Sequence, residues 1–62
     1  MKQRIYWDNK QPQYWIWRKN SITGIGYFCF KTNNQEEAIN FYSSIADNPK
    51  FEARMYDKGN LI

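Results

Sequence analysis

Apolar residues fill every position of two short segments of this chain, residues 14–17 and 25–30. A strand with one face in water alternates apolar and polar side chains, because successive side chains point to opposite faces of the sheet. These two segments do not alternate. A sheet built from them is therefore predicted to have two apolar faces.

Three strands are predicted in the first half of the chain, at residues 2–8, 14–19 and 25–31. Each is rich in aromatic and β-branched residues, which favour strands. A polar turn containing Pro12 separates the first two strands, and a loop containing Gly24 separates the second from the third.

An amphipathic helix is predicted to follow and to end near residue 46, because capping side chains precede acids and a helical apolar period. The capping box is formed either by Thr32 with Gln35 or by Asn33 with Glu36. The apolar stripe of this helix consists of Ala38, Phe41, Tyr42 and Ile45.

The end of the chain returns to the period of a strand. Residues 51–57 alternate, which predicts a strand with one face in water, and residues 61–62 are expected to form a short return or to tuck in. The order β-β-β-α-β predicts an α+β fold for a single compact domain over residues 1–62. Its sheet is expected to be mainly antiparallel, with one helix packed on one face.

Alternation along the two central strands sorts their side chains between the faces of the sheet. The helix is predicted to cover Trp15, Trp17, Phe28 and Phe30, and Gly26 indicates either a bulge or a close approach to the backbone. The opposite face then carries Tyr14, Ile16, Arg18, Ile25, Tyr27 and Cys29. The inverse assignment satisfies the same alternation. One helix covers one face, so a second copy, a partner protein or stacked bases must cover the other, unless the ends of the chain fold over it.

Composition narrows the ways in which such a short chain is stabilised. It has 62 residues, of which 19% are aromatic, and buried rings compensate for a small core. Cys29 is the only cysteine and there is no histidine, so no disulfide within one copy and no zinc site are expected. The lone cysteine and an N-terminus without an apolar signal segment predict an intracellular, cytoplasmic setting, and no run of apolar residues is long enough to span a membrane.

Catalysis is not expected from these residues. No histidine is available as a base for a serine or for Cys29, and Glu36 and Glu37 suit the first turn of a helix. No cofactor, metal or small-molecule substrate is therefore predicted. The sequence indicates a non-enzymatic binding protein, and it is expected to occupy a surface of another protein as an inhibitor or adaptor.

The predicted protein-binding surface is aromatic and partly cationic, as protein interfaces are. Homodimerisation through the sheet or an edge strand is expected as well. Small aromatic chains of this kind are similar to accessory and anti-defence proteins of phages and mobile elements. The partner-binding residues are predicted to be Tyr14, Ile16, Arg18, Ile25 and Tyr27, with Tyr6, Arg54 and Tyr56 at the rim.

Nucleic-acid binding is the alternative function. The net charge is +3 with scattered basic residues, which permits contact with phosphates without demanding it. Aromatic residues interleaved with Arg and Lys on a sheet stack bases and hold phosphates. On this hypothesis the contacts come from Arg18, Lys19, Lys31 and Arg54.

Residues 30–38 read Phe-Lys-Thr-Asn-Asn-Gln-Glu-Glu-Ala, and the stretch 13–46 resembles the arm-type DNA-binding domain of tyrosine integrases. That resemblance implies three strands before a helix and a sheet that inserts into the major groove. The strands here are more apolar than in that family and the basic residues are fewer.

Overall fold

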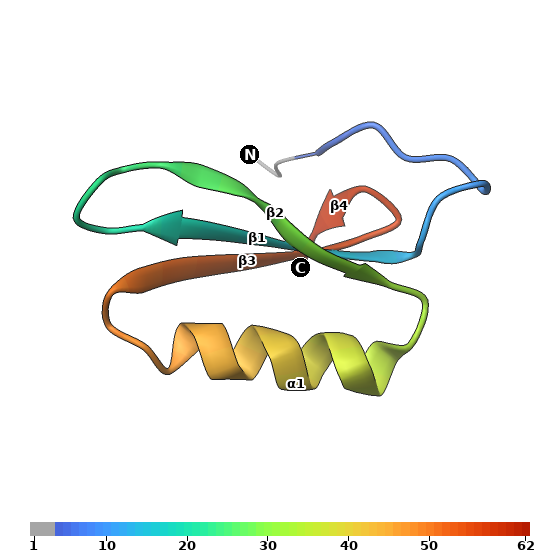
Figure 1. The fold of residues 1–62 in the computed structure, drawn as a ribbon. Helices are drawn as coiled ribbons and strands as arrows, with labels where there is room; N and C mark the ends of the chain where they lie inside the picture. The colour runs from blue at the N-terminus through green and yellow to red at the C-terminus, as the bar shows by residue number, and fades with distance from the viewer. Residues whose placement is uncertain (1–3) are drawn as a thin grey trace.

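The computed structural model describes residues 4–62 and shows two layers, an antiparallel sheet and one helix beneath it (Figure 1). The sheet has four strands in the order β2-β1-β3-β4, so β1 and β3 are central and β2 and β4 are edges. The α+β class with an antiparallel sheet and one helix is confirmed. The elements are β1 (Tyr14–Asn20), β2 (Gly26–Thr32), α1 (Gln35–Ala46), β3 (Phe51–Asp57) and β4 (Asn60–Leu61).

The strand predicted at residues 2–8 is not one of these four. Its first part lies outside the described residues, and in the rest Arg4 forms an isolated bridge with Asn60. The place beside β3 is taken by β4, because a tight turn returns the chain there. Lys58 and Gly59 both have positive φ, 50° and 87°, as the two central residues of a type I′ hairpin turn require.

The helix begins one residue later than the predicted box of Asn33 with Glu36 requires, and two residues later than the box of Thr32 with Gln35 requires. Asn34 is the N-cap, and its side-chain oxygen accepts a hydrogen bond from the backbone N–H of Glu37 at 3.0 Å. Glu36 and Glu37 lie in the first turn, where the positive end of the helix dipole favours them. The predicted stripe faces the sheet: Ala38 and Ile45 are buried, and Phe41 and Tyr42 pack against the core.

The two faces of the sheet are the inverse of the predicted assignment. Tyr14 and Ile16 lie under the helix and are 7% and 0% exposed, so they belong to the core. Because side chains alternate along β1, Trp15 and Trp17 point to the opposite face. The prediction that these two tryptophans lie under the helix is therefore wrong.

A bulge on β2 separates two phenylalanines that strict alternation would place together. Ile16 pairs with Phe30 and Trp17 pairs with Phe28, so Cys29 is the extra residue. Phe30 stacks on Phe41 of the helix with ring centres 4.4 Å apart, whereas Phe28 lies on the other side of the sheet. The bulge is thus located at Cys29 rather than at Gly26, and of the two phenylalanines only Phe30 faces the helix.

The chain's own N-terminal segment closes part of the face that the helix leaves open. It runs on the side of the sheet away from α1 (Figure 1), and the backbone N–H of Ile5 donates to the carbonyl of Gly59 at 2.8 Å. The indole N–H groups of Trp7 and Trp15 both donate to the carbonyl of Pro12, each at 2.8 Å. Tyr56 is only 4% exposed and its ring packs against Phe28, so the wet face predicted for β3 is closed at this end.

Candidate functional site

The sheet face turned away from α1, here called the outer face, gathers aromatic and cationic side chains from three adjacent strands. Register and alternation place them there, since Trp15 lies opposite Lys31 and Tyr56, and Trp17 lies opposite Phe28 and Arg54. Lys19 follows at the next outward position of β1. The outer face thus consists of Trp15, Trp17, Lys19, Phe28, Lys31, Arg54 and Tyr56, together with Gly26 and Glu52.

The rings of the outer face pack edge to face. Phe28 lies with its ring centre 5.3 Å from that of Trp15 and 5.7 Å from that of Tyr56, so it crosses above β1. Such T-shaped pairs match the negative face of one ring to the positive edge of the next. Trp15, Trp17 and Phe28 remain half-buried, so part of each ring is accessible on this surface.

Two cations lie over these rings. The Lys31 ammonium nitrogen is 4.0 Å from the ring centre of Trp15, and the Arg54 guanidinium carbon is 4.7 Å from that of Trp17. Arg54 also forms an ion pair with Glu52 at 3.6 Å. Both side chains therefore hold positive charge directly against the aromatic cluster.

Gly26 makes room for the ring of Trp17 on the edge strand. A Cβ at Gly26 would stand 2.2 Å from Cζ2 of Trp17, which no real Cβ contact allows. The indole therefore occupies the space that a side chain at this position would fill. Trp17 leans toward the β2 edge, on the side of the outer face that is remote from the N-terminal segment and β4.

Charge is divided between the helix and the rest of the chain. The helix and its two caps contain Glu36, Glu37 and Asp47 and no Lys or Arg. The rest of the chain holds all nine Lys and Arg residues against three acids. The mild net charge of the whole chain thus conceals an acidic helix and a basic remainder.

The structure brings only some of the predicted protein-binding residues together. Tyr14, Ile16 and Tyr56 are buried in the monomer and cannot meet a partner, which corrects the prediction for these three residues. Arg18 lies on the helix side, where its guanidinium stacks on Phe51 and hydrogen-bonds the hydroxyl of Tyr27. Ile25 and Tyr27 lie at the connection between β1 and β2, whereas Tyr6 and Arg54 lie elsewhere on the surface.

Tyr6, a predicted rim residue, is part of a local contact in the N-terminal segment. It is 75% exposed, and its hydroxyl donates to Oδ2 of Asp8 at 2.8 Å. This hydrogen bond and the negative charge of Asp8 raise the pKa of Tyr6 above its ordinary value of 10.0.

Three of the four residues predicted for nucleic-acid contact do lie on one surface. Lys19, Lys31 and Arg54 are on the outer face, and Arg18 is on the opposite one. Trp15 and Trp17 lie beside them, whereas the prediction from the sequence places both tryptophans in the core under the helix. One signal could have found this arrangement: Trp15, Trp17 and Lys19 recur at every second residue of β1, as one face of a strand does.

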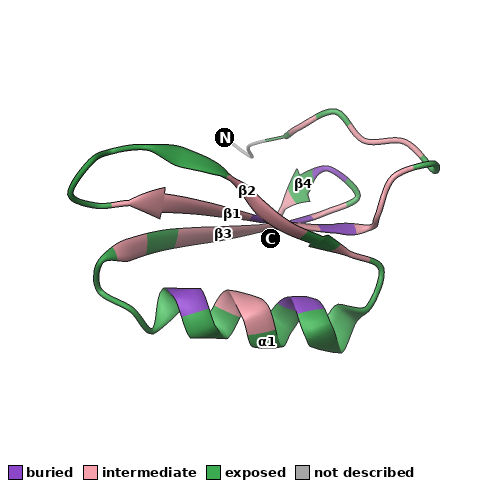
Figure 2. Ribbon diagram, in the orientation of Figure 1, coloured by how far each residue is buried: buried purple, intermediate pink, exposed green. Residues whose placement is uncertain are grey.

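Exposed apolar side chains gather at the connection between β1 and β2, here called the hairpin end. Ile22, Ile25 and Tyr27 are 80%, 65% and 49% exposed. Figure 2 shows this connection and the start of β2 as one exposed stretch at the end of the sheet. Ile22 was missing from the predicted surface, because a single apolar residue in a polar loop gives no periodic signal.

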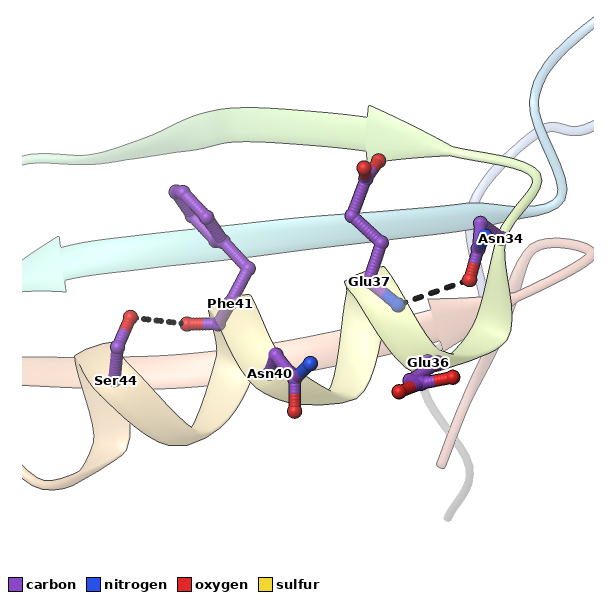
Figure 3. Close-up of a pocket in the computed structure, with 6 residues that line it drawn as sticks. All are labelled: Asn34, Glu36, Glu37, Asn40, Phe41 and Ser44. Atoms are coloured by element: carbon purple, nitrogen blue, oxygen red, sulfur yellow. Dashed lines mark hydrogen bonds between the residues drawn. The ribbon is translucent and has the colours of Figure 1, made fainter.

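A hollow of about 520 Å³ lies along the helix and is lined by polar residues (Figure 3). Its polar groups already serve the helix: Asn34 caps it, and the Ser44 hydroxyl donates to the carbonyl of Phe41 at 2.8 Å. Glu37 and Phe41 point toward the sheet in this view. The hollow is open to solvent, and we place no site in it.

Within residues 4–62, no group of His, Cys, Asp or Glu side chains is arranged to hold a metal ion. The same residues contain no helix with the length and apolarity needed to cross a membrane. Comparisons with family models, with curated proteins and with solved structures find no match for this chain. The resemblance to the arm-type domain implied three strands before the helix, whereas two strands precede α1 in the described part of the chain.

Proposed function

We propose that this protein binds nucleic acid on the outer face of its sheet. One observation carries the proposal: Lys19, Lys31 and Arg54 lie on three neighbouring strands around Trp15 and Trp17. Cations supply the attraction to phosphates, and rings supply a surface on which bases stack.

The division of charge between the helix and the rest of the chain supports the same orientation. An approaching polyanion is repelled by the acidic helix and attracted by Lys19, Lys31 and Arg54 on the outer face. Such steering orients the encounter before any contact forms. Nucleic-acid binding here therefore does not need a strongly basic chain.

The accessible part of the outer face is its β2 side. The N-terminal segment contacts Gly59, Asn60 and Pro12, which are at the β4 side and at the start of β1. Trp17 is on β1 and Lys31 is on the edge strand β2. In the strand order both therefore lie in the half of the outer face away from β4. A nucleic acid that follows β1 and β2 would meet both without displacing the N-terminal segment.

The test is fluorescence anisotropy of labelled oligonucleotides, both single-stranded and duplex, titrated with the intact protein at several salt concentrations. Affinity is expected to fall steeply between about 50 and about 200 mM salt, because bound cations release counterions from the phosphates. Lys31→Ala is expected to lower the slope of log affinity against log salt by about 0.7–0.9, the value for one phosphate contact.

Lys50→Ala is the matched control for that variant. Lys50 is exposed in the connection between α1 and β3, and it carries the same charge away from the outer face. Its removal is expected to leave the slope unchanged. Equal slopes for the two variants, or no binding to either oligonucleotide, would contradict the proposal.

A second candidate function, docking of another protein, is favoured by the hairpin end. Three exposed apolar residues lie there, Ile22, Ile25 and Tyr27, and the guanidinium of Arg18 lies over the ring of Tyr27. Tyr and Arg are common anchors in protein interfaces. This surface would also serve a homodimer, and the protein would then act as an inhibitor or adaptor.

Sedimentation velocity over a range of protein concentrations tests self-association at the hairpin end. Tyr27→Glu is expected to abolish it while the helix signal in circular dichroism stays unchanged. A protein that is monomeric at every concentration, or a Tyr27→Glu variant that still associates, would remove the homodimer. We place both candidate functions inside the cell, since Cys29 is the only cysteine and no disulfide can form within one copy.

A further inference from the structure

We propose that the outer face binds single-stranded nucleic acid in preference to duplex; this rests on the proposed function. The observation is the kind of side chain at its centre. The outward positions of β1, β2 and β3 carry four rings, three cations, one glycine and one acid, and none of them carries an Asn or Gln.

A duplex offers base edges and phosphates, whereas its base planes are stacked on one another. Sheets that enter a major groove read those edges with side chains that donate and accept hydrogen bonds, such as Arg, Asn and Gln. Trp15, Trp17 and Phe28 occupy the centre of the outer face. A phenyl ring has no hydrogen-bonding group, an indole has a single N–H donor, and that of Trp15 already donates to the carbonyl of Pro12. Rings instead suit the planes of unpaired bases.

Trp17 is the ring best placed to stack a base. It lies toward the edge strand over Gly26, and its far side carries Arg54 at 4.7 Å from the ring centre. Lys19 follows two residues later on the same face of β1. A base on the accessible part of this indole therefore has Arg54 of the neighbouring strand β3, and Lys19 two residues along β1, for its flanking phosphates.

The length of the face matches a short segment of strand. From residue 15 to residue 19, β1 extends about 13 Å. Four-stranded sheets that bind RNA stack two or three bases on rings over a similar surface. The contact with Lys31 lies at the Trp15 end of this row.

The experiment compares affinities of the intact protein for oligo(dT), oligo(U) and a DNA duplex of the same length at one salt concentration. Tighter binding of either single strand than of the duplex supports the inference. Duplex bound as tightly as both single strands, or more tightly, overturns it and leaves the proposed function in place. No binding to any of the three overturns both.

Substitution of Trp17 tests the stacking itself. Trp17→Leu keeps apolar volume without a ring face and is expected to weaken single-strand binding by roughly 5- to 150-fold, the range for one stacked base. Trp17→Phe keeps a ring and is expected to retain most of the affinity. Circular dichroism and urea unfolding establish that both variants are folded. Equal single-strand affinity of Trp17→Leu and the unmodified protein would overturn the role of Trp17.

Discussion

Replacing Ile16 by valine tests which side of the sheet the helix covers. Ile16 is 0% exposed and lies on β1 between Phe30 of β2 and Met55 of β3. Removing one buried methylene from such a site costs about 0.5–1.5 kcal/mol, from lost burial and from the cavity left behind. Alternation predicted Ile16 on the open face, where the same change would cost almost nothing.

Valine is a better choice than alanine here because the reserve of stability is small. For the 62-residue chain, the free energy of unfolding is expected to be about 3–9 kcal/mol, from typical values per residue. Ile16→Ala would remove about 2–5 kcal/mol of this and could unfold the protein. Ile16→Val keeps the native state populated, so the unfolding transitions of the variant and of the unmodified protein can both be measured.

Urea unfolding followed by tryptophan fluorescence measures the difference in the free energy of unfolding between Ile16→Val and the unmodified protein. With a slope of about 1 kcal/mol per molar urea, Ile16→Val is expected to lower the midpoint by about 0.5–1.5 M. Ile25→Val is the matched control, because Ile25 is 65% exposed and surface changes stay within about 0.5 kcal/mol. Equal midpoints for the two variants would refute the placement of Ile16 beneath the helix.

Three other predictions follow from individual contacts. Gly26→Ala is expected to displace the indole of Trp17, which stands 2.2 Å from the new Cβ, and to change the near-ultraviolet circular dichroism; an unchanged spectrum would contradict the contact. Asn34→Ala removes the N-cap and is expected to cost about 1 kcal/mol in urea unfolding, whereas no change would mean that another group caps the helix. Asp8→Asn is expected to lower the pKa of Tyr6 toward 10.0 in an NMR titration, because the carboxylate favours the protonated phenol; an unmoved pKa would exclude that cause.

The sequence predicts most elements of this fold to within about two residues. The helix and the strands at β1, β2 and β3 follow from propensity, period and turn residues, which are local properties. The position of the fourth strand, β4, does not follow from local properties. Whether residues 2–8 or residues 60–61 pair with β3 depends on contacts between distant parts of the chain, and here the tight turn at Lys58 and Gly59 brings β4 there.

The two faces were not predictable from alternation, for a physical reason. A polar residue normally marks the side of a strand that meets water, but residues 14–17 are all apolar and provide no such mark. The bulge at Cys29 then reverses the side on which Phe28 lies relative to Phe30. Bulges depend on the pairing of two strands, so a sequence that shows one strand at a time does not reveal them.

The sequence therefore predicts the kinds of residue in the candidate site, but not the face of the sheet on which they lie. Aromatic residues interleaved with cations predict a surface for nucleic acid. Of the four cations predicted for it, Lys19, Lys31 and Arg54 lie on the outer face and Arg18 does not. Their tryptophan neighbours were assigned to the core. The net charge of the chain also does not show that its acids are concentrated in α1. This becomes apparent only when the charges of the helix are counted separately from those of the rest of the chain.

Chemical-shift mapping with oligo(dT) on the isotope-labelled protein tests the central claim most directly. The outer face is predicted to respond: the indole N–H signal of Trp17 and the backbone signals of β2 shift on addition of the oligonucleotide, while those of the outward side of α1 do not. Shifts confined to α1 or to the hairpin end, or no shifts at all, would contradict the assignment of nucleic-acid binding to the outer face.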